Sequence, residues 1–218
     1  MPRRLIDISM LVLSIVLMGG LTLFENSGTH KRLGGALFLL WICHNVFNRH
    51  FYKNLFRGKY RGFRIAMLVV NFGILVSGIL LIVSGVILSP KILDVDFGLA
   101  FSRTAHLIAS HWYFTLIAVH FSFHAAMFFS RISLFKKSPS AKRIAQVAVV
   151  LVSLYGIYAL ILRGFFKYLF YTQKFFFFDL ERGIPLFLLD YFSIFVLMAS
   201  VTFAVLKILR RAKSLPRA

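Results

Sequence analysis

Apolar stretches of roughly 20 residues alternate with short basic links along the whole chain of 218 residues. Six such stretches are found, at residues 5–24, 30–48, 65–88, 104–129, 144–163 and 185–208. At ~1.5 Å of rise per residue, each is long enough to cross a hydrocarbon core of ~30 Å as a helix. Because a helix satisfies its own backbone hydrogen bonds in lipid, the pattern predicts an all-α, polytopic transmembrane bundle of six spans.

The distribution of charge predicts how this bundle is oriented. The chain is 59% hydrophobic and yet carries a formal net charge of +19, because its basic residues are concentrated in the links. Of the 26 lysines and arginines, 18 lie in the N-terminus, the 49–64 and 130–143 links and the C-terminal tail. The positive-inside rule then places both termini in the cytoplasm, which predicts a multi-pass membrane protein. Since topology explains these charges, we expect a lipid membrane and no nucleic acid as a partner.

Cysteine usage narrows the redox chemistry that this chain can support. Its single cysteine, Cys43, excludes an internal disulfide, a C-x-x-C-H attachment site for c-type haem and an iron–sulfur cluster held by several cysteines of this chain. No small-x-small cleavage pattern follows the stretch 5–24, so we expect it to be retained as a span.

Two of the predicted spans carry histidine pairs with the same spacing. His30 and His44 are 14 residues apart, and so are His106 and His120. Fourteen residues at ~100° each fall only ~40° short of four turns, so the members of each pair share one helix face and lie ~21 Å apart along the axis. The two spans are separated by a single intervening span and therefore run parallel. The outer pair, His30 and His106, thus shares one level of the membrane, and the inner pair, His44 and His120, shares the other.

Two facing imidazoles at each level favour haem iron. Neutral imidazole is a good iron ligand, and a porphyrin supplies the other four ligands. Zinc requires three or four protein ligands. A proton relay does not require equal spacing in two helices, and four histidines that merely bond to neighbouring helices leave the spacing unexplained. We therefore predict that His30, His44, His106 and His120 are the metal ligands of two haem b (heme b) groups.

Further residues near these ligands are candidates for cofactor binding. His124 lies one turn past His120, and either replaces it as the ligand or sits beside the inner haem. Arg103, three residues before His106, is the best placed cation for an outer haem propionate. His111 is rotated by ~140° from His106 and is expected to face a neighbouring helix or the interface. His50 is expected at the membrane surface.

Small residues mark the third span, which carries Ser77-Gly78 and Ser84-Gly85 seven residues apart on one face. Small residues at this spacing either allow close helix packing or make room for a flat cofactor.

The residues of the first four spans resemble a known class of membrane protein. The chain is similar to a di-haem cytochrome b-type bacterial integral membrane family, in which two parallel helices each supply two axial histidines. The residues that carry the resemblance lie within about 25–130 and are His30, Gly34, His44, Asn48, Asn71, Ser84, Gly85, Ser89, His106, His120 and His124. The b-type subunits of respiratory complexes and the ferric-reductase-like membrane domains are similar as well.

This resemblance implies electron transfer across the membrane, with quinone or quinol as donor or acceptor and a redox partner subunit at one face. The chain is then the electron-transfer subunit of an oxidoreductase complex, with a di-haem four-helix core at residues 1–130. Residues 131–218 add two helices and an outer aromatic loop at 163–183. The alternatives are a ferric-reductase-like donor to an extracytoplasmic acceptor and, from another class, a non-haem transporter or proton channel. The latter needs intramembrane carboxylates, and Asp190 is the only acid within a late span.

Overall fold

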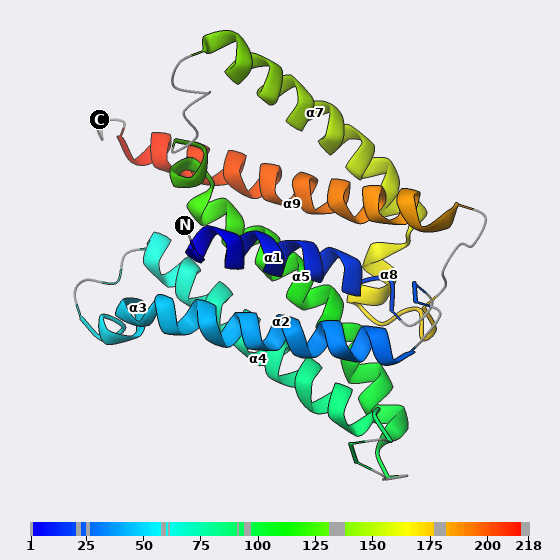
Figure 1. The fold of residues 1–218 in the computed structure, drawn as a ribbon. Coiled ribbons are helices and arrows are strands. Elements are labelled where there is room, and N and C mark those ends of the chain that lie inside the picture. The colour runs from blue at the N-terminus through cyan, green and yellow to red at the C-terminus, as the bar shows by residue number, and fades with distance from the viewer. Residues whose placement is uncertain are drawn as a thin grey trace.

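The computed structural model describes residues 2–20, 23–24, 27–57, 60, 62–90, 92–93, 97–130, 138–176 and 182–214. Every regular element in these ranges is a helix (Figure 1). The helices are α1 (Pro2–Leu17), α2 (Ser27–Phe47), α3 (Arg49–Lys53), α4 (Gly62–Ile87), α5 (Leu99–Ser130), α7 (Pro139–Leu162), α8 (Phe165–Leu169) and α9 (Gly183–Ser214). The predicted all-α class is thereby confirmed, and a long helix covers most of each of the six predicted stretches.

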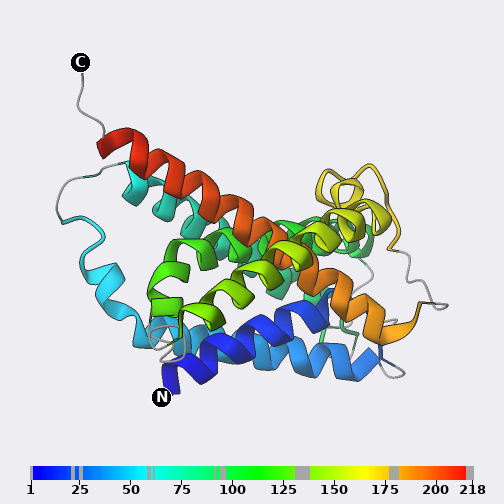
Figure 2. The same cartoon turned by 90° about the horizontal axis from the view of Figure 1, so that it is seen from above.

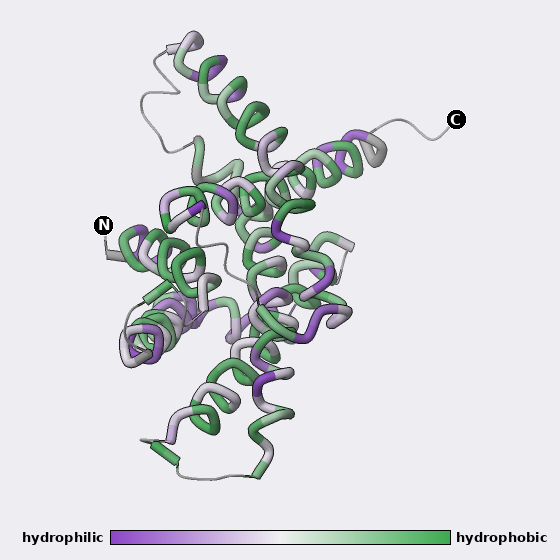
Figure 3. Tube along the Cα trace, turned by 90° about the vertical axis from the view of Figure 1, so that its right-hand side faces the viewer, coloured by the Kyte–Doolittle hydropathy of each residue, from purple (hydrophilic) through white to green (hydrophobic). Residues whose placement is uncertain are grey.

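Three of these helices, α4, α7 and α9, are long and apolar enough to cross a membrane. Their mean hydropathy over the best window lies between 2.2 and 2.6. Most of their side chains lie on the surface of the isolated chain, and hydrophobic residues dominate the helical tubes (Figure 3). Of the other long helices, α2 carries Lys31 and Arg32 near its start, α5 carries four histidines, and α1 has only 16 residues.

The first helix is shorter than the sequence pattern predicts. The apolar stretch extends over 5–24, whereas α1 ends at Leu17 and a turn follows over residues 18–20. Gly20 takes a φ of 61°, a left-handed conformation that glycine adopts at little cost. Hydropathy does not register this break, because the residues that follow the turn are again apolar.

Helix α5 occupies the centre of the fold. It packs along α4 on one side and along α9 on the other, while α7 packs on α9 and α1 packs on α2 (Figures 1 and 2). The buried core joins α1, α5, α7, α8 and α9 around the fully buried Phe114, Phe165 and Phe187. The start of α1 and the end of α9 lie at the same end of the bundle.

A buried ion pair joins the C-terminal end of α7 to α9, at the end of the bundle opposite to the start of α1. Nε of Arg163 donates to Oδ2 of Asp190 at 2.9 Å, and Nη2 lies 2.8 Å from the same oxygen as an ion-pair contact. Asp190 has no exposed surface. The hydroxyl of Tyr155 donates to the other carboxylate oxygen at 2.6 Å, and Arg182 Nη2 lies 3.7 Å from that oxygen. The one acid of the late spans is thus neutralised by neighbouring side chains.

The backbones of α7 and α9 also approach each other closely at Gly156. A Cβ added to Gly156 of α7 would collide with the backbone carbonyl of Ser193 in α9. Glycine is therefore required at this position for α7 and α9 to pack as they do.

Candidate functional site

The four predicted ligands lie between two pairs of helices. Helix α2 makes its close backbone contacts with α1, and α5 makes them with α4 and α9. The α1–α2 layer faces the α4–α5 layer (Figures 1 and 2), with at most sparse backbone contact between α2 and either helix of the other layer. Side chains of α1 and the turn that follows it, such as Ile15 and Met18, pack with α5 in the core, and the predicted ligands come from α2 and α5.

The outer pair meets across these layers. The ring centroids of His30 and His106 are 6.2 Å apart, with an angle of 61° between the ring planes. Two imidazoles on opposite sides of one metal ion, each with a metal–nitrogen distance of ~2.0–2.1 Å, have centroids ~6.3 Å apart. The observed separation of the outer pair therefore suits two axial ligands of one metal.

A serine of α4 fixes the protonation of His106. Nδ1 of His106 lies 2.9 Å from Oγ of Ser84. The single proton of this hydroxyl is donated to the carbonyl of Leu80 at 2.5 Å, so Oγ accepts from Nδ1–H. The lone pair of Nε2 is then available to a metal, in the arrangement that metal-ligating histidines adopt.

His30 retains a nitrogen without a partner. Its Nδ1 is buried and has no hydrogen-bond partner within the described parts of the chain. The ring interacts with the backbone of Gly20, in the turn that ends the first helix, and the ring of Phe24 lies 6.2 Å away. A buried polar nitrogen without a hydrogen-bond partner is unfavourable in a native protein. Such a nitrogen is consistent with a site that takes a ligand.

Two acceptors fix the inner pair in the same way. Nδ1 of His44 lies 2.7 Å from Oδ1 of Asp7, and Nδ1 of His120 lies 2.8 Å from Oδ1 of Asn71. Both oxygens can only accept, so both histidines carry their proton on Nδ1 and present the Nε2 lone pair. His44 and Asp7 lie close enough to His120 to interact with it electrostatically.

His124 belongs to the same inner cluster. Its ring centroid is 5.0 Å from that of His120, and it lies within electrostatic range of His44 and Asp7. His120 is distinguished from it by the Asn71 carbonyl oxygen, which orients the His120 ring. Geometry thus favours His120 as the partner of His44, with His124 beside the pair.

The remaining predicted residues lie elsewhere. Arg103 is exposed on the first turns of α5, and none of the described contacts joins it to His30 or His106. His111 is 1% exposed and packs against Phe165 and Tyr168 of α8, so it faces a neighbouring element and not the histidine pairs. His50 is exposed at the start of the short α3.

Glycines leave space next to the two pairs. A Cβ added to Gly34 on α2 or to Gly78 on α4 would meet nothing within 4 Å, and one added to Gly85 would lie 3.8 Å from Cε1 of His106. Gly78 lies midway between Asn71 and Gly85 at intervals of seven residues, and so on the same helix face. Gly34 and Gly78 are therefore not packed closely against a neighbouring helix, whereas Ser77 and Ser84 are buried.

The histidine pairs offer too few side chains for a metal ion bound by protein ligands alone. Within the described ranges, no group of three or more His, Cys, Asp and Glu side chains is arranged to hold a metal ion. Two imidazoles per level satisfy an iron atom only if another group supplies its remaining ligands, as a porphyrin does.

Sequence reasoning missed the acceptors that orient the ligands. The sequence alone assigned no role to Asp7, although an acid within an apolar stretch often marks a functional site. Asn71 and Ser84 enter through the family resemblance, and their bonds to His120 and His106 become visible only in three dimensions.

The comparisons with known proteins return no match. No protein-family model, no curated protein and no solved structure is significantly similar to the chain. The functional argument therefore rests on the residues and their geometry.

Proposed function

We propose that this protein is a membrane di-haem cytochrome b-type subunit that carries electrons across a bacterial inner membrane. The observation that supports it most is the outer pair, whose rings lie 6.2 Å apart although they come from different helix layers. Matched Nδ1 acceptors on the other three predicted ligands add to this, because second-shell acceptors are typical of histidines that bind a metal.

Each residue of the proposed site has its own role. His30 and His106 hold the outer haem, and His44 and His120 hold the inner one. When bound, haem supplies reversible one-electron chemistry at its iron. Ser84 and Asn71 keep the α5 imidazoles in the tautomer that binds iron, and the Asp7 carboxylate makes His44 a stronger electron donor. Arg103, at the outer end of α5, would neutralise a propionate of the outer haem.

Six spans are the arrangement that this function requires. In addition to α4, α7 and α9, the proposal places α1, α2 and α5 across the membrane. Helix α5, with 32 residues, is ~48 Å long, and α2, with 21 residues, is ~31 Å long. Their polar residues are tolerated in lipid because most of them face the haem site or the ends of the bundle. The basic residues then place the termini and the 49–64 link in the cytoplasm.

The electron donor and acceptor are proposed by resemblance. A quinone or quinol and a redox partner subunit are the expected pair, and a ferric-reductase-like role with an extracytoplasmic acceptor is the alternative. Reduction of the bound haems by a quinol would favour the first, and reduction by a cytoplasmic flavoprotein alone would favour the second. A transporter or proton channel is less well supported, because Asp190, its one late intramembrane acid, is neutralised by Arg163.

Haem content tests the proposal. The protein is expressed in haem-replete cells and purified in mild detergent, and a pyridine haemochrome assay counts haem b per chain. We expect two haems for the wild type, one for His106→Ala and one for His44→Ala. His50→Ala, which removes an exposed histidine, is the matched control and should retain two. A haem-free but folded wild type would overturn the proposal.

A further inference from the structure

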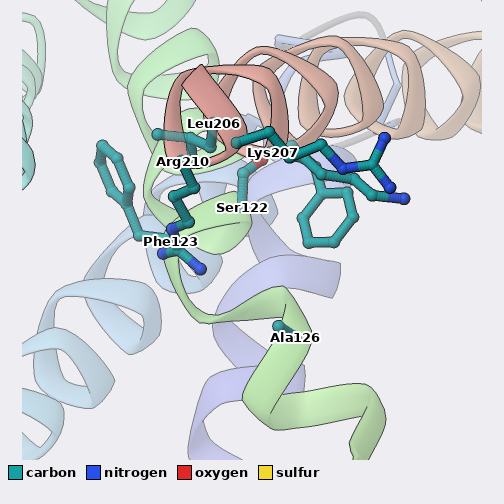
Figure 4. A pocket seen from close by; sticks show the side chains of 8 residues that line it. Ser122, Phe123, Ala126, Leu206, Lys207 and Arg210 are labelled. Atoms are coloured by element: carbon teal, nitrogen blue, oxygen red, sulfur yellow. The ribbon is translucent and has the colours of Figure 1, made fainter. Parts of the chain in front are cut away.

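An open pocket lies between α5 and α9, at the end of the bundle where α1 begins and α9 ends. Its volume is about 370 Å³. One wall is apolar and includes Phe123 and Ala126 of α5 together with Phe203 and Leu206 of α9 (Figure 4). This wall borders the apolar surface of α9, the longest of the three helices that could cross a membrane.

The other wall of the pocket is strongly basic. Lys207, Arg210 and Arg211 line it, all from the last turns of α9, and no acid is among the lining residues. The Arg210 guanidinium lies 4.9 Å from the centre of the Phe63 ring, and Phe63 packs edge-on against Phe123 at 5.3 Å. A cation held against aromatic rings in this way is pre-positioned at the pocket.

This pocket is separate from the histidine site. Around the axis of α5, Ser122 is rotated by ~160° from both His120 and His124, and Ala126 by ~160° from His124 and ~120° from His120. The Ser122 hydroxyl is already engaged, since it lies 3.0 Å from the carbonyl of Ala118 and 2.7 Å from that of Ala199. The proposed haem sites therefore do not explain the apolar and basic walls of this pocket.

We propose that the pocket binds a membrane phospholipid with an anionic headgroup. Lys207, Arg210 and Arg211 surround the phosphate, and the apolar wall receives the upper part of an acyl chain. A basic pocket between helices at the cytoplasmic membrane surface is a typical site for anionic lipid headgroups. A soluble anion uses only the basic wall, whereas a phospholipid satisfies both walls. The inference requires α9 to cross the membrane, but it does not depend on haem.

Lipid titration of the full-length protein tests this inference. The detergent-solubilised protein is titrated with dioleoyl-phosphatidylglycerol and separately with dioleoyl-phosphatidylcholine, and bound lipids are counted by native mass spectrometry. We expect one phosphatidylglycerol to bind in preference to phosphatidylcholine. The double variant K207Q/R210Q should weaken it roughly 30-fold, at about 5-fold for each basic residue near an anionic surface.

Two further variants distinguish lipid binding in the pocket from non-specific attraction between the lipid and the positively charged protein. K142Q/R143Q removes two exposed cations from the start of α7, outside the pocket, and should bind the lipid like the wild type. Ala126→Trp fills the pocket without changing charge and should lose the preferred lipid. Equal binding of both lipids, or wild-type binding by K207Q/R210Q, would overturn the inference. Displacement of the lipid by glycerol phosphate at equal concentration would identify a soluble-anion site instead.

Discussion

The Ser84 hydroxyl oxygen lies 2.9 Å from Nδ1 of His106 and joins α4 to α5 beside the outer histidine pair. Ser77, one heptad earlier on α4, is equally buried, but its hydroxyl bonds only to the carbonyls of Gly73 and Ile74. The two serines thus share a helix face and a mode of backbone bonding, and differ in the contact with a histidine.

Ser84→Ala should alter the outer haem without unfolding the protein. Loss of the acceptor makes His106 a weaker donor to ferric iron, so we expect the outer midpoint potential to rise by roughly 20–60 mV, where ~59 mV corresponds to about 1.4 kcal/mol for one electron. Haem affinity should fall about 10- to 100-fold. A spectroelectrochemical titration measures the potential, and Ser77→Ala should match the wild type. Equal shifts in both variants would show that the Ser84–His106 contact does not tune the site.

Asp7→Asn should act on the inner haem in the same direction. The asparagine keeps an acceptor for His44 but removes a negative charge. Because that negative charge stabilises ferric iron more than ferrous iron, its loss favours the ferrous state. We expect the inner potential to rise by roughly 20–60 mV, while the outer potential stays within error. Asp7→Glu retains the charge and is the control. A shift confined to the outer haem would contradict the pairing of Asp7 with the inner level.

Single substitutions of His120 and His124 show which of the two histidines is the inner haem ligand. Because Asn71 orients His120, His120→Ala should remove one haem per chain, whereas His124→Ala should retain both and change only the spectrum of one. Asn71→Leu should weaken the inner haem, in parallel with His120→Ala. Haem counts from the pyridine haemochrome assay give the answer. Loss of a haem in His124→Ala, with both retained in His120→Ala, would exchange the two roles.

The buried ion pair between α7 and α9 should dominate the stability of this part of the fold. Asp190→Asn leaves the Arg163 guanidinium buried beside a neutral amide, which costs about 3–5 kcal/mol when one partner of a buried pair is removed. Thermal unfolding in detergent, followed by circular dichroism, should show a clear fall in Tm. The double variant R163M/D190M replaces both charges with apolar side chains and should recover much of the loss. A double variant less stable than Asp190→Asn would argue against charge burial as the cause.

Helix content and the pairing of the outer histidines were accessible from sequence, because both depend on periodicity along single helices. The interval of 14 residues places His30 and His44 on one face of their helix whatever surrounds it. The predicted sharing of a level by His30 and His106 follows from parallel helices, and their rings do lie next to each other in the fold.

The acceptors and the helix ends were not accessible in this way. The contacts from Asp7 to His44 and from Asn71 to His120 depend on how neighbouring helices slide and rotate against each other, which residue spacing does not fix. The end of α1 at Leu17 depends on the backbone conformation of Gly20, and a hydropathy pattern carries no such information. The role of Arg103 as a propionate partner stays a prediction.

The pairing of Arg163 with Asp190 constrains the biosynthesis of the protein. Arg163 leaves the ribosome 27 residues before Asp190, so a growing chain holds this charge at the end of α7 before its counterion exists. An unpaired aspartate near the centre of a membrane-spanning helix costs about 2.5–3.5 kcal/mol. The helices α7 and α9 should therefore leave the insertion machinery together, as one hairpin whose charges are already matched.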